Sequence, residues 1–260
     1  MLDNIPRNLI RGIEEVSHLL SQRGWAEKNA GNLSIDVTEE IKGGGKGRHF
    51  VLKKRVQALG ERYLLITPSG SRFRDIAKGI TSLLLVRIDR DGRGYEVLNY
   101  KEGIRPTSEF ASHILIHNVL REMNSEYRVV LHTHPTELIT LSHIQSYHSD
   151  ARLSRLLYSA HPEVYINLAD RIGFVKYATT GTEILANATV RCIKRGKSVI
   201  IWERHGALSI ERDVYSAFDH IDIANKAADI SLRLFMIGKK PIPLKDPQIE
   251  ELKRIVIKSI

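Results

Sequence analysis

Apolar residues recur along the chain at two different periods, and the period predicts where helices and strands lie. Residues 6–24 carry apolar positions three and four apart and stop at Gly24, which predicts an amphipathic helix. Several later segments show the same spacing, and the last of them carries a long apolar stripe that ends near residue 237. The other helices predicted in this way lie within residues 105–123, 136–144, 182–196 and about 213–237.

Shorter β-prone runs stand between the predicted helices. Residues 82–100 are typical of a hairpin that turns at Asp91 and Gly92, and three adjacent glycines, Gly43–Gly45, predict a mobile loop. Strands and helices mix irregularly and without a linker. We therefore expect residues 1–260 to form a single three-layer α/β/α domain with a mostly antiparallel central sheet. The remaining predicted strands lie within residues 31–37, 62–70, 126–131 and 197–205.

Composition sets few further limits on function. The chain has 260 residues, 42% hydrophobic and 27% charged, as in an ordinary soluble globular protein. No apolar run approaches the ~20 residues that cross a bilayer, so we expect no membrane partner. The single cysteine, Cys192, excludes a disulfide framework and a thiolate metal site. A reducing, cytoplasmic setting is the expectation that fits.

The formal net charge of +9 raises the question of nucleic-acid binding. The basic residues are spread along the chain in small groups such as Lys53–Arg55, without a stripe interleaved with aromatic residues. A positive protein also attracts small anionic substrates. We therefore expect a small anionic ligand and no nucleic-acid partner.

Two histidines, His132 and His134, follow a strand-like apolar run at a spacing of two. Side chains two apart on a strand point to one face, so both imidazoles can reach one point. A later apolar run is interpreted as a strand ending at His205, where Gly206 permits close backbone approach. Three imidazoles with an open position form the ligand set of a catalytic zinc ion, although a His-x-His spacing alone is a weak signal. Structural roles, at the surface or partly buried, are assigned to His18, His113, His117, His143 and His148.

Three turns rich in hydroxyl, amide and glycine residues are candidate anion cradles. Glu109 stands in the predicted first turn of a helix, with Thr107 or Ser108 as the predicted N-cap, and helix-start amides beside hydroxyls suit phosphate. Taken singly, each turn is more simply explained as a cap or loop. The residue type of Glu109 leaves open whether it binds a metal or acts as an acid/base. The residues of these turns that could bind an anion are Asn29, Asn32, Ser69, Gly70, Thr107 and Ser108.

Five short motifs occur in the order AGNLS, ITPSG, PTSE, HTHP and RHGAL. In this order and with these gaps, the chain resembles the class II aldolase/adducin family from about Gly24 to Ile237. Within that family it looks most like the rhamnulose-phosphate branch. The motif GWAEKNAGNLSI is similar to that branch, and the segment Thr38–Arg62 is long where the fuculose-phosphate branch is shorter.

The resemblance implies zinc-dependent retro-aldol cleavage of L-rhamnulose 1-phosphate to dihydroxyacetone phosphate and L-lactaldehyde. By motif, His132, His134 and His205 would hold Zn²⁺, and Glu109 would be the catalytic acid/base. The six residues of the turns would receive the phosphate of the ketose substrate. The family forms C4 homotetramers with active sites at subunit interfaces. Glu163, in HPEVYINL, matches a catalytic glutamate that the neighbouring subunit contributes.

Other activities of the same fold stay open at this point. L-fuculose-1-phosphate aldolase performs the same cleavage on a ketose of different stereochemistry at C3 and C4. A ribulose-phosphate 4-epimerase shares the zinc ligands but has aspartate where this chain has Glu109, whereas methylthioribulose-1-phosphate dehydratase keeps a glutamate. Adducin-like members are non-catalytic scaffolds without a metal site, an alternative that the three histidines disfavour.

Overall fold

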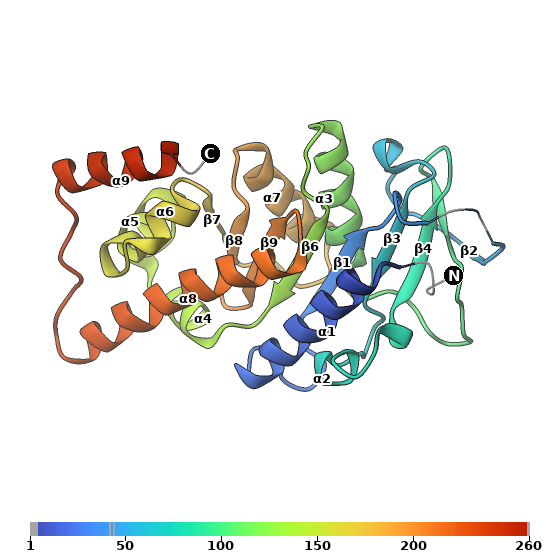
Figure 1. Ribbon diagram of the computed structural model, residues 1–260, viewed down its shortest axis with the longest axis horizontal. Coiled ribbons are helices and arrows are strands. Elements are labelled where there is room, and N and C mark those ends of the chain that lie inside the picture. The colour runs from blue at the N-terminus through green and yellow to red at the C-terminus, as the bar shows by residue number, and fades with distance from the viewer. Residues whose placement is uncertain (1–4, 42, 44, 259–260) are drawn as a thin grey trace.

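The computed structural model describes residues 5–41, 43 and 45–258, and a nine-stranded sheet forms its centre (Figure 1). The strand order is β2-β5-β4-β3-β1-β6-β9-β8-β7. Every pairing between these strands is antiparallel except the parallel pairing of β7 with β8, so the predicted, mostly antiparallel α/β sheet is confirmed. The strands are β1 (Asn32–Asp36), β2 (Arg48–Val51), β3 (Tyr63–Ile66), β4 (Leu84–Ile88), β5 (Gly94–Val97), β6 (Val129–Thr133), β7 (Ile172–Val175), β8 (Val199–Trp202) and β9 (Gly206–Glu211).

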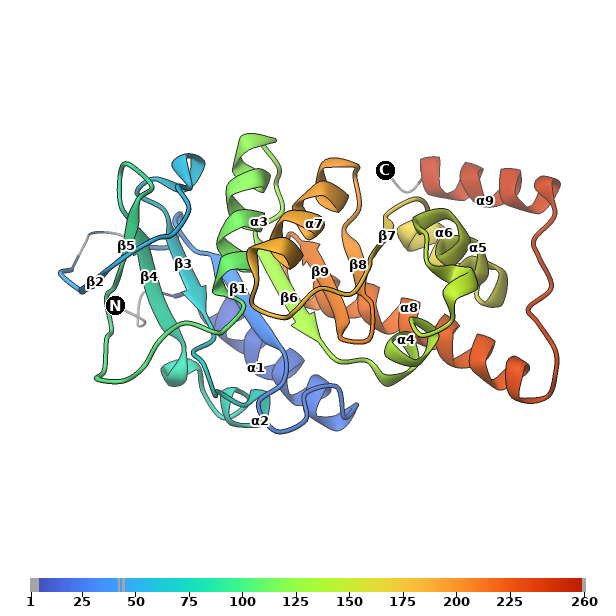
Figure 2. The same ribbon diagram turned by 180° about the vertical axis from the view of Figure 1, so that it is seen from behind.

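Helices cover both faces of the sheet and make the outer layers. Figure 1 shows α1 and α8 across the near face, and Figure 2 shows α3 and α7 across the opposite face. None of the described helices has the length and apolar character needed to cross a bilayer. The helices are α1 (Arg7–Gln22), α2 (Phe73–Ile76), α3 (Phe110–Glu122), α4 (Thr136–Leu141), α5 (Asp150–Ala160), α6 (Glu163–Leu168), α7 (Glu183–Lys194), α8 (Val214–Met236) and α9 (Asp246–Lys258).

Strand alternation divides the core between the two faces of the sheet. On β1, Leu33 and Ile35 pack into the apolar cluster that includes α1 and α8. The alternate positions of β1 are polar, and Asn32 and Ser34 hydrogen-bond to side chains of α3. Both are 5% exposed or less. A buried polar stripe therefore separates β1 from α3, at the middle of an otherwise apolar interior.

Two predicted boundaries are wrong, and the backbone explains why. The strand predicted to end at His205 ends at Trp202, because Arg204 adopts a left-handed φ of 59° and turns the chain into β9. The helix with a predicted cap at Thr107 or Ser108 begins at Phe110, with Glu109 at the N-cap position and no side-chain cap. The backbone N–H of Thr107 donates to Thr67 O at 3.0 Å, which ties this residue to the loop after β3.

The glycine-rich segment predicted to be a mobile loop is only partly described. Gly44, the middle residue of the triplet, lies outside the described residues. The hairpin predicted over residues 82–100 is confirmed, since β4 pairs antiparallel with β5 and Gly92 takes a left-handed φ of 69°.

Candidate metal centre and active site

Strand β6 and the residue that follows it present two imidazoles. His132 lies opposite Asn32 of β1, and its Nδ1 donates to the carbonyl oxygen of Ala207 at 3.0 Å. Because a carbonyl only accepts, Nδ1 carries the proton and Nε2 carries the free lone pair. His134 repeats this arrangement, with Nδ1 2.8 Å from Glu27 Oε1. Both rings are thus held in the tautomer that leaves Nε2 free to bind a metal ion.

The third imidazole, His205, comes from the turn between β8 and β9. The turn is fixed because the Arg204 N–H donates to Ser142 Oγ at 2.8 Å. At the next position, a Cβ on Gly206 would lie 2.8 Å from His132 Cε1 and 3.0 Å from His134 Cδ2. The prediction that Gly206 permits close approach is confirmed, since any side chain here would collide with the rings.

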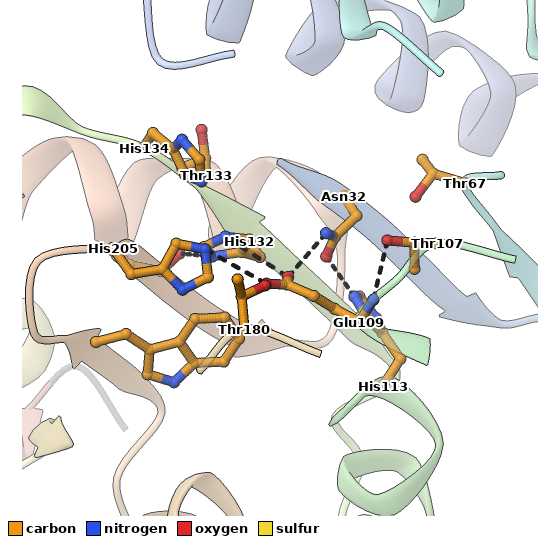
Figure 3. Close-up of polar contacts among 12 residues, drawn as sticks. Asn32, Thr67, Thr107, Glu109, His113, His132, Thr133, His134, Thr180 and His205 are labelled. Carbon is orange, nitrogen blue, oxygen red and sulfur yellow. Dashed lines mark hydrogen bonds and ion pairs between the residues drawn. The ribbon is translucent and has the colours of Figure 1, made fainter. Parts of the chain in front are cut away.

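The three imidazoles converge, as the sequence predicted (Figure 3). One potential ligand nitrogen from each ring lies within 4.8 Å of the other two. His132 Nε2 is buried and has no hydrogen-bond partner among the described residues. Burial and the neighbouring imidazoles lower the pKa of His132, and burial lowers that of His205, so these rings stay neutral. Neutral imidazoles with an unpaired buried nitrogen fit a divalent metal ion.

The carboxylate of Glu109 lies beside the three rings. Its Oε2 is 3.6 Å from His132 Nε2 and its Oε1 is 3.4 Å from His205 Nε2. Each oxygen also accepts one hydrogen bond of 2.9 Å, Oε2 from Asn32 Nδ2 and Oε1 from Thr180 Oγ1 (Figure 3). Glu109 is 3% exposed, so these contacts fix its carboxyl group in a nearly dry position.

Two of the three candidate anion turns lie side by side. A β-bridge joins Pro68 with Pro106, and the Ser69 N–H donates to Arg105 O at 2.8 Å. Gly70 takes a left-handed φ of 78°, which its missing side chain permits. Four of the predicted anion-binding residues are exposed, namely Asn29, Ser69, Gly70 and Ser108, whereas Asn32 and Thr107 are buried.

Glu163 does not join this group within one chain. It is the first residue of α6, and its exposed carboxylate lies 3.4 Å from Asn167 Nδ2. Among the described residues, it makes no hydrogen bond or ion pair with the three histidines or with Glu109.

The sequence interpretation missed several residues around the centre. Glu27 and Thr180 were not singled out, and His113 and His117 were assigned surface or partly buried roles. Both of these histidines are 1% exposed. The signal was present, because residues 109, 113 and 117 recur at a spacing of four, which places them on one face of a helix.

Comparisons with known proteins identify the family of the chain. A family model described as the class II aldolase and adducin N-terminal domain matches residues 11–232. A rhamnulose-1-phosphate aldolase from Bacteroides thetaiotaomicron is 30% identical over 251 residues, which cover 94% of this chain and 92% of that protein. The solved structure of a sugar-phosphate aldolase from Thermotoga maritima is 33% identical with a TM-score of 0.77, covering 90% of this chain and 98% of its own. An L-fuculose 1-phosphate aldolase shares the fold, with a TM-score of 0.66 at 19% identity over 98% of this chain and 97% of its own.

Proposed function

The chain belongs to the class II aldolase and adducin family, and we propose that it cleaves L-rhamnulose 1-phosphate to dihydroxyacetone phosphate and L-lactaldehyde. Family membership makes it an aldolase lyase of a metal-dependent class. The observation that carries the proposal is the convergence of His132, His134 and His205 beside the carboxylate of Glu109. The choice of sugar is supported by the relative at 30% identity, which is named for this substrate.

The metal is proposed to be Zn²⁺, held by His132, His134 and His205. Three imidazole nitrogens with open coordination positions are the usual ligand set of catalytic zinc. A bound zinc ion supplies positive charge next to the enediolate that remains when the C3–C4 bond breaks. The chain's own contribution is to hold three imidazoles in place, with His132 and His134 oriented by Ala207 and Glu27.

Glu109 is proposed as the acid/base. In the cleavage direction its carboxyl group gives a proton to C3 of the enediolate, and in the synthetic direction its carboxylate removes that proton. The position of Glu109 supports this role, since Oε2 lies 3.6 Å from His132 Nε2 and Oε1 lies 3.4 Å from His205 Nε2. A substrate held at the metal would therefore have its reacting carbon close to Glu109.

The phosphate is proposed to bind at the adjoining turns. Ser69, Gly70, Thr107 and Ser108 present hydroxyl and amide groups, and Asn29 with the second amide hydrogen of Asn32 completes the set. Binding energy from a group remote from the reacting carbons orients the ketose over the metal. The net charge of +9 supports an anionic substrate.

A C4 homotetramer with interfacial active sites is proposed, in which Glu163 acts at the centre of a neighbouring copy. The exposed position of Glu163, away from the centre of its own chain, supports this arrangement. Mixed tetramers of Glu163→Ala and Glu109→Gln subunits test this arrangement. Some of their sites would combine Glu109 from the first variant with Glu163 from the second, and these sites would be active. If the mixed protein stays as inactive as the separate variants, or if light scattering gives a monomer, the interfacial role is excluded.

The chain is further proposed to form one domain over residues 1–260 and to work in the cytoplasm. All nine described strands join one sheet, which supports the first statement. The single cysteine is buried and free, which suits a reducing compartment.

The test of substrate is a side-by-side cleavage assay on rhamnulose, fuculose and ribulose phosphates, with dihydroxyacetone phosphate detected in each case. We expect the highest kcat/KM on L-rhamnulose 1-phosphate. A preference for the fuculose substrate would replace the proposed sugar while keeping the reaction. Interconversion of pentulose phosphates without dihydroxyacetone phosphate would instead identify an epimerase.

A further inference from the structure

A chain of buried hydrogen bonds leads away from Glu109, on the side opposite the metal ligands. Asn32 Nδ2 donates to Glu109 Oε2 at 2.9 Å, and Asn32 Oδ1 lies 2.5 Å from His113 Nε2 (Figure 3). Beyond this, Ser34 Oγ lies 2.6 Å from His113 Nδ1 and 2.8 Å from His117 Nε2. The four residues behind Glu109 are each 5% exposed or less.

The chemistry of these groups allows only one direction of donation. A carboxylate only accepts, so the amide nitrogen of Asn32 must face Glu109 and its oxygen must face His113. That oxygen also only accepts, and His113 Nε2 therefore carries a proton. Burial lowers the pKa of His113 to about 3, so the ring is neutral and its Nδ1 accepts the Ser34 proton. The Ser34 oxygen is then left to accept from His117 Nε2, whose pKa burial lowers to about 4.

We propose that Ser34, His113 and His117 are positioning residues for the acid/base, because they hold the Asn32 amide with its nitrogen toward Glu109 Oε2 and so leave Oε1 to carry the catalytic proton. This inference rests on the proposed role of Glu109. An Oε2 that permanently accepts from Asn32 is the poorer site for a proton, whereas Oε1 faces Thr180, whose hydroxyl can rotate to accept instead. The proton that moves between Glu109 and C3 of the substrate thus has one defined atom of origin.

Loss of the Ser34 hydroxyl would remove what fixes the tautomer of His113. With Nδ1 protonated, the unprotonated Nε2 would attract the amide nitrogen of Asn32, and the amide would turn its oxygen toward Glu109. Two acceptors would then face each other in a buried place, which displaces the carboxylate. The effect falls chiefly on the chemical step, since the proposed metal ligands and every proposed phosphate contact except that of Asn32 are left in place.

The first test compares two buried serines. Ser34→Ala and Ser112→Ala each delete one buried hydroxyl, but that of Ser112 has no hydrogen-bond partner among the described residues. We expect Ser34→Ala to lower kcat roughly tenfold to hundredfold with KM changed less than about threefold, and Ser112→Ala to resemble the unaltered protein. Exchange of the C3 proton of dihydroxyacetone phosphate with solvent deuterium should fall in parallel. Equal kcat in the two variants would overturn the proposal.

The second test uses rescue at His113. His113→Gln keeps an N–H donor that can reach Asn32 Oδ1, whereas His113→Phe fills the space without one. We expect the glutamine variant to keep kcat within about fivefold and the phenylalanine variant to fall at least as far as Ser34→Ala, with similar melting temperatures. A glutamine variant as slow as the phenylalanine variant would show that His113 only fills space.

A third measurement does not depend on catalysis. Nitrogen-15 spectra of histidine-labelled protein should show His113 and His117 as neutral rings protonated at Nε2, with the His113 signals altered in Ser34→Ala. Rings protonated at Nδ1 would overturn the proposed direction. If the unaltered protein neither cleaves a ketose phosphate nor exchanges the C3 proton, the proposed function fails, while these spectra still decide the direction of the chain.

Discussion

The centre contains two groups of histidines on opposite sides of Glu109, and they differ in what their nitrogens touch. His132 has one nitrogen hydrogen-bonded to a carbonyl and the other without a hydrogen-bond partner among the described residues, whereas both nitrogens of His113 are hydrogen-bonded. Burial lowers the pKa of His113 and that of His132, so the protonation state does not separate these two rings. The difference teaches that a nitrogen without a hydrogen bond, more than burial or an altered pKa, distinguishes a candidate metal ligand from a structural histidine.

The largest expected effect comes from the group with free nitrogens. His205→Ala should lower both bound zinc and cleavage rate, the latter by about a thousandfold, because metal stabilisation of the enediolate contributes several kcal/mol. Metal analysis together with kcat measures it. Activity close to normal in a variant without bound metal would remove the distinction between the two groups.

The next effect concerns the carboxylate between the groups. Glu109→Gln should retain the metal but lower kcat by about a few hundredfold, since an amide cannot exchange the proton with C3. Zinc content and steady-state kinetics on the same sample separate the two properties. Normal turnover by this variant would show that another group moves the proton.

A smaller effect tests the hydrogen-bonded group through stability. His113 and His117 have folded pKa values of about 3 and about 4, below the unfolded value of 6.5. At pH values between the folded and unfolded pKa, the unfolded chain binds more protons than the folded chain. The free energy of unfolding therefore decreases as the pH falls below 6.5. Each ring should remove about 2 kcal/mol from the free energy of unfolding between pH 6.5 and 4.5. Urea unfolding of metal-free protein measures this, and His117→Gln should weaken the dependence.

The smallest expected effect tests the orientation of His134. Glu27→Gln replaces the carboxylate beside His134 Nδ1 with an amide, and Glu27 is 62% exposed at the side chain. Partners of metal-bound histidines contribute about 10 to 100-fold in affinity, and exposure places Glu27 at the lower end. Competition with a chromogenic chelator should therefore show about tenfold weaker zinc binding. Unchanged affinity would mean that the backbone alone orients His134.

The elements with strong periodicity could be predicted from the sequence, and those fixed by distant contacts could not. The helix over residues 6–24 appears as α1, and the stripe over 213–237 appears as α8. Helices α5 and α9 were not predicted. The helix expected near Thr107 starts only at Phe110, and the N–H of Thr107 donates to Thr67 on a separate loop, a contact that no local pattern reveals.

The candidate site could be predicted as far as single motifs reach. His132 and His134 follow from strand spacing, while the meeting with His205 depended on two strand ends coming together, and the structure supplies a turn instead. Thr180 reaches Glu109 from a loop 71 positions away, and no local pattern reveals such a contact. The hydrogen bond between Ser34 of β1 and His113 of α3 could not be predicted for the same reason, because the two residues are distant in the sequence.

The antiparallel register that pairs Thr133 with Ala207 has a consequence for biosynthesis. A growing chain that has not yet emerged past β9 carries two of the three imidazoles but lacks the partner strand that aligns them. Binding of the proposed metal ion by all three imidazoles would therefore wait until about four-fifths of the polypeptide has been made.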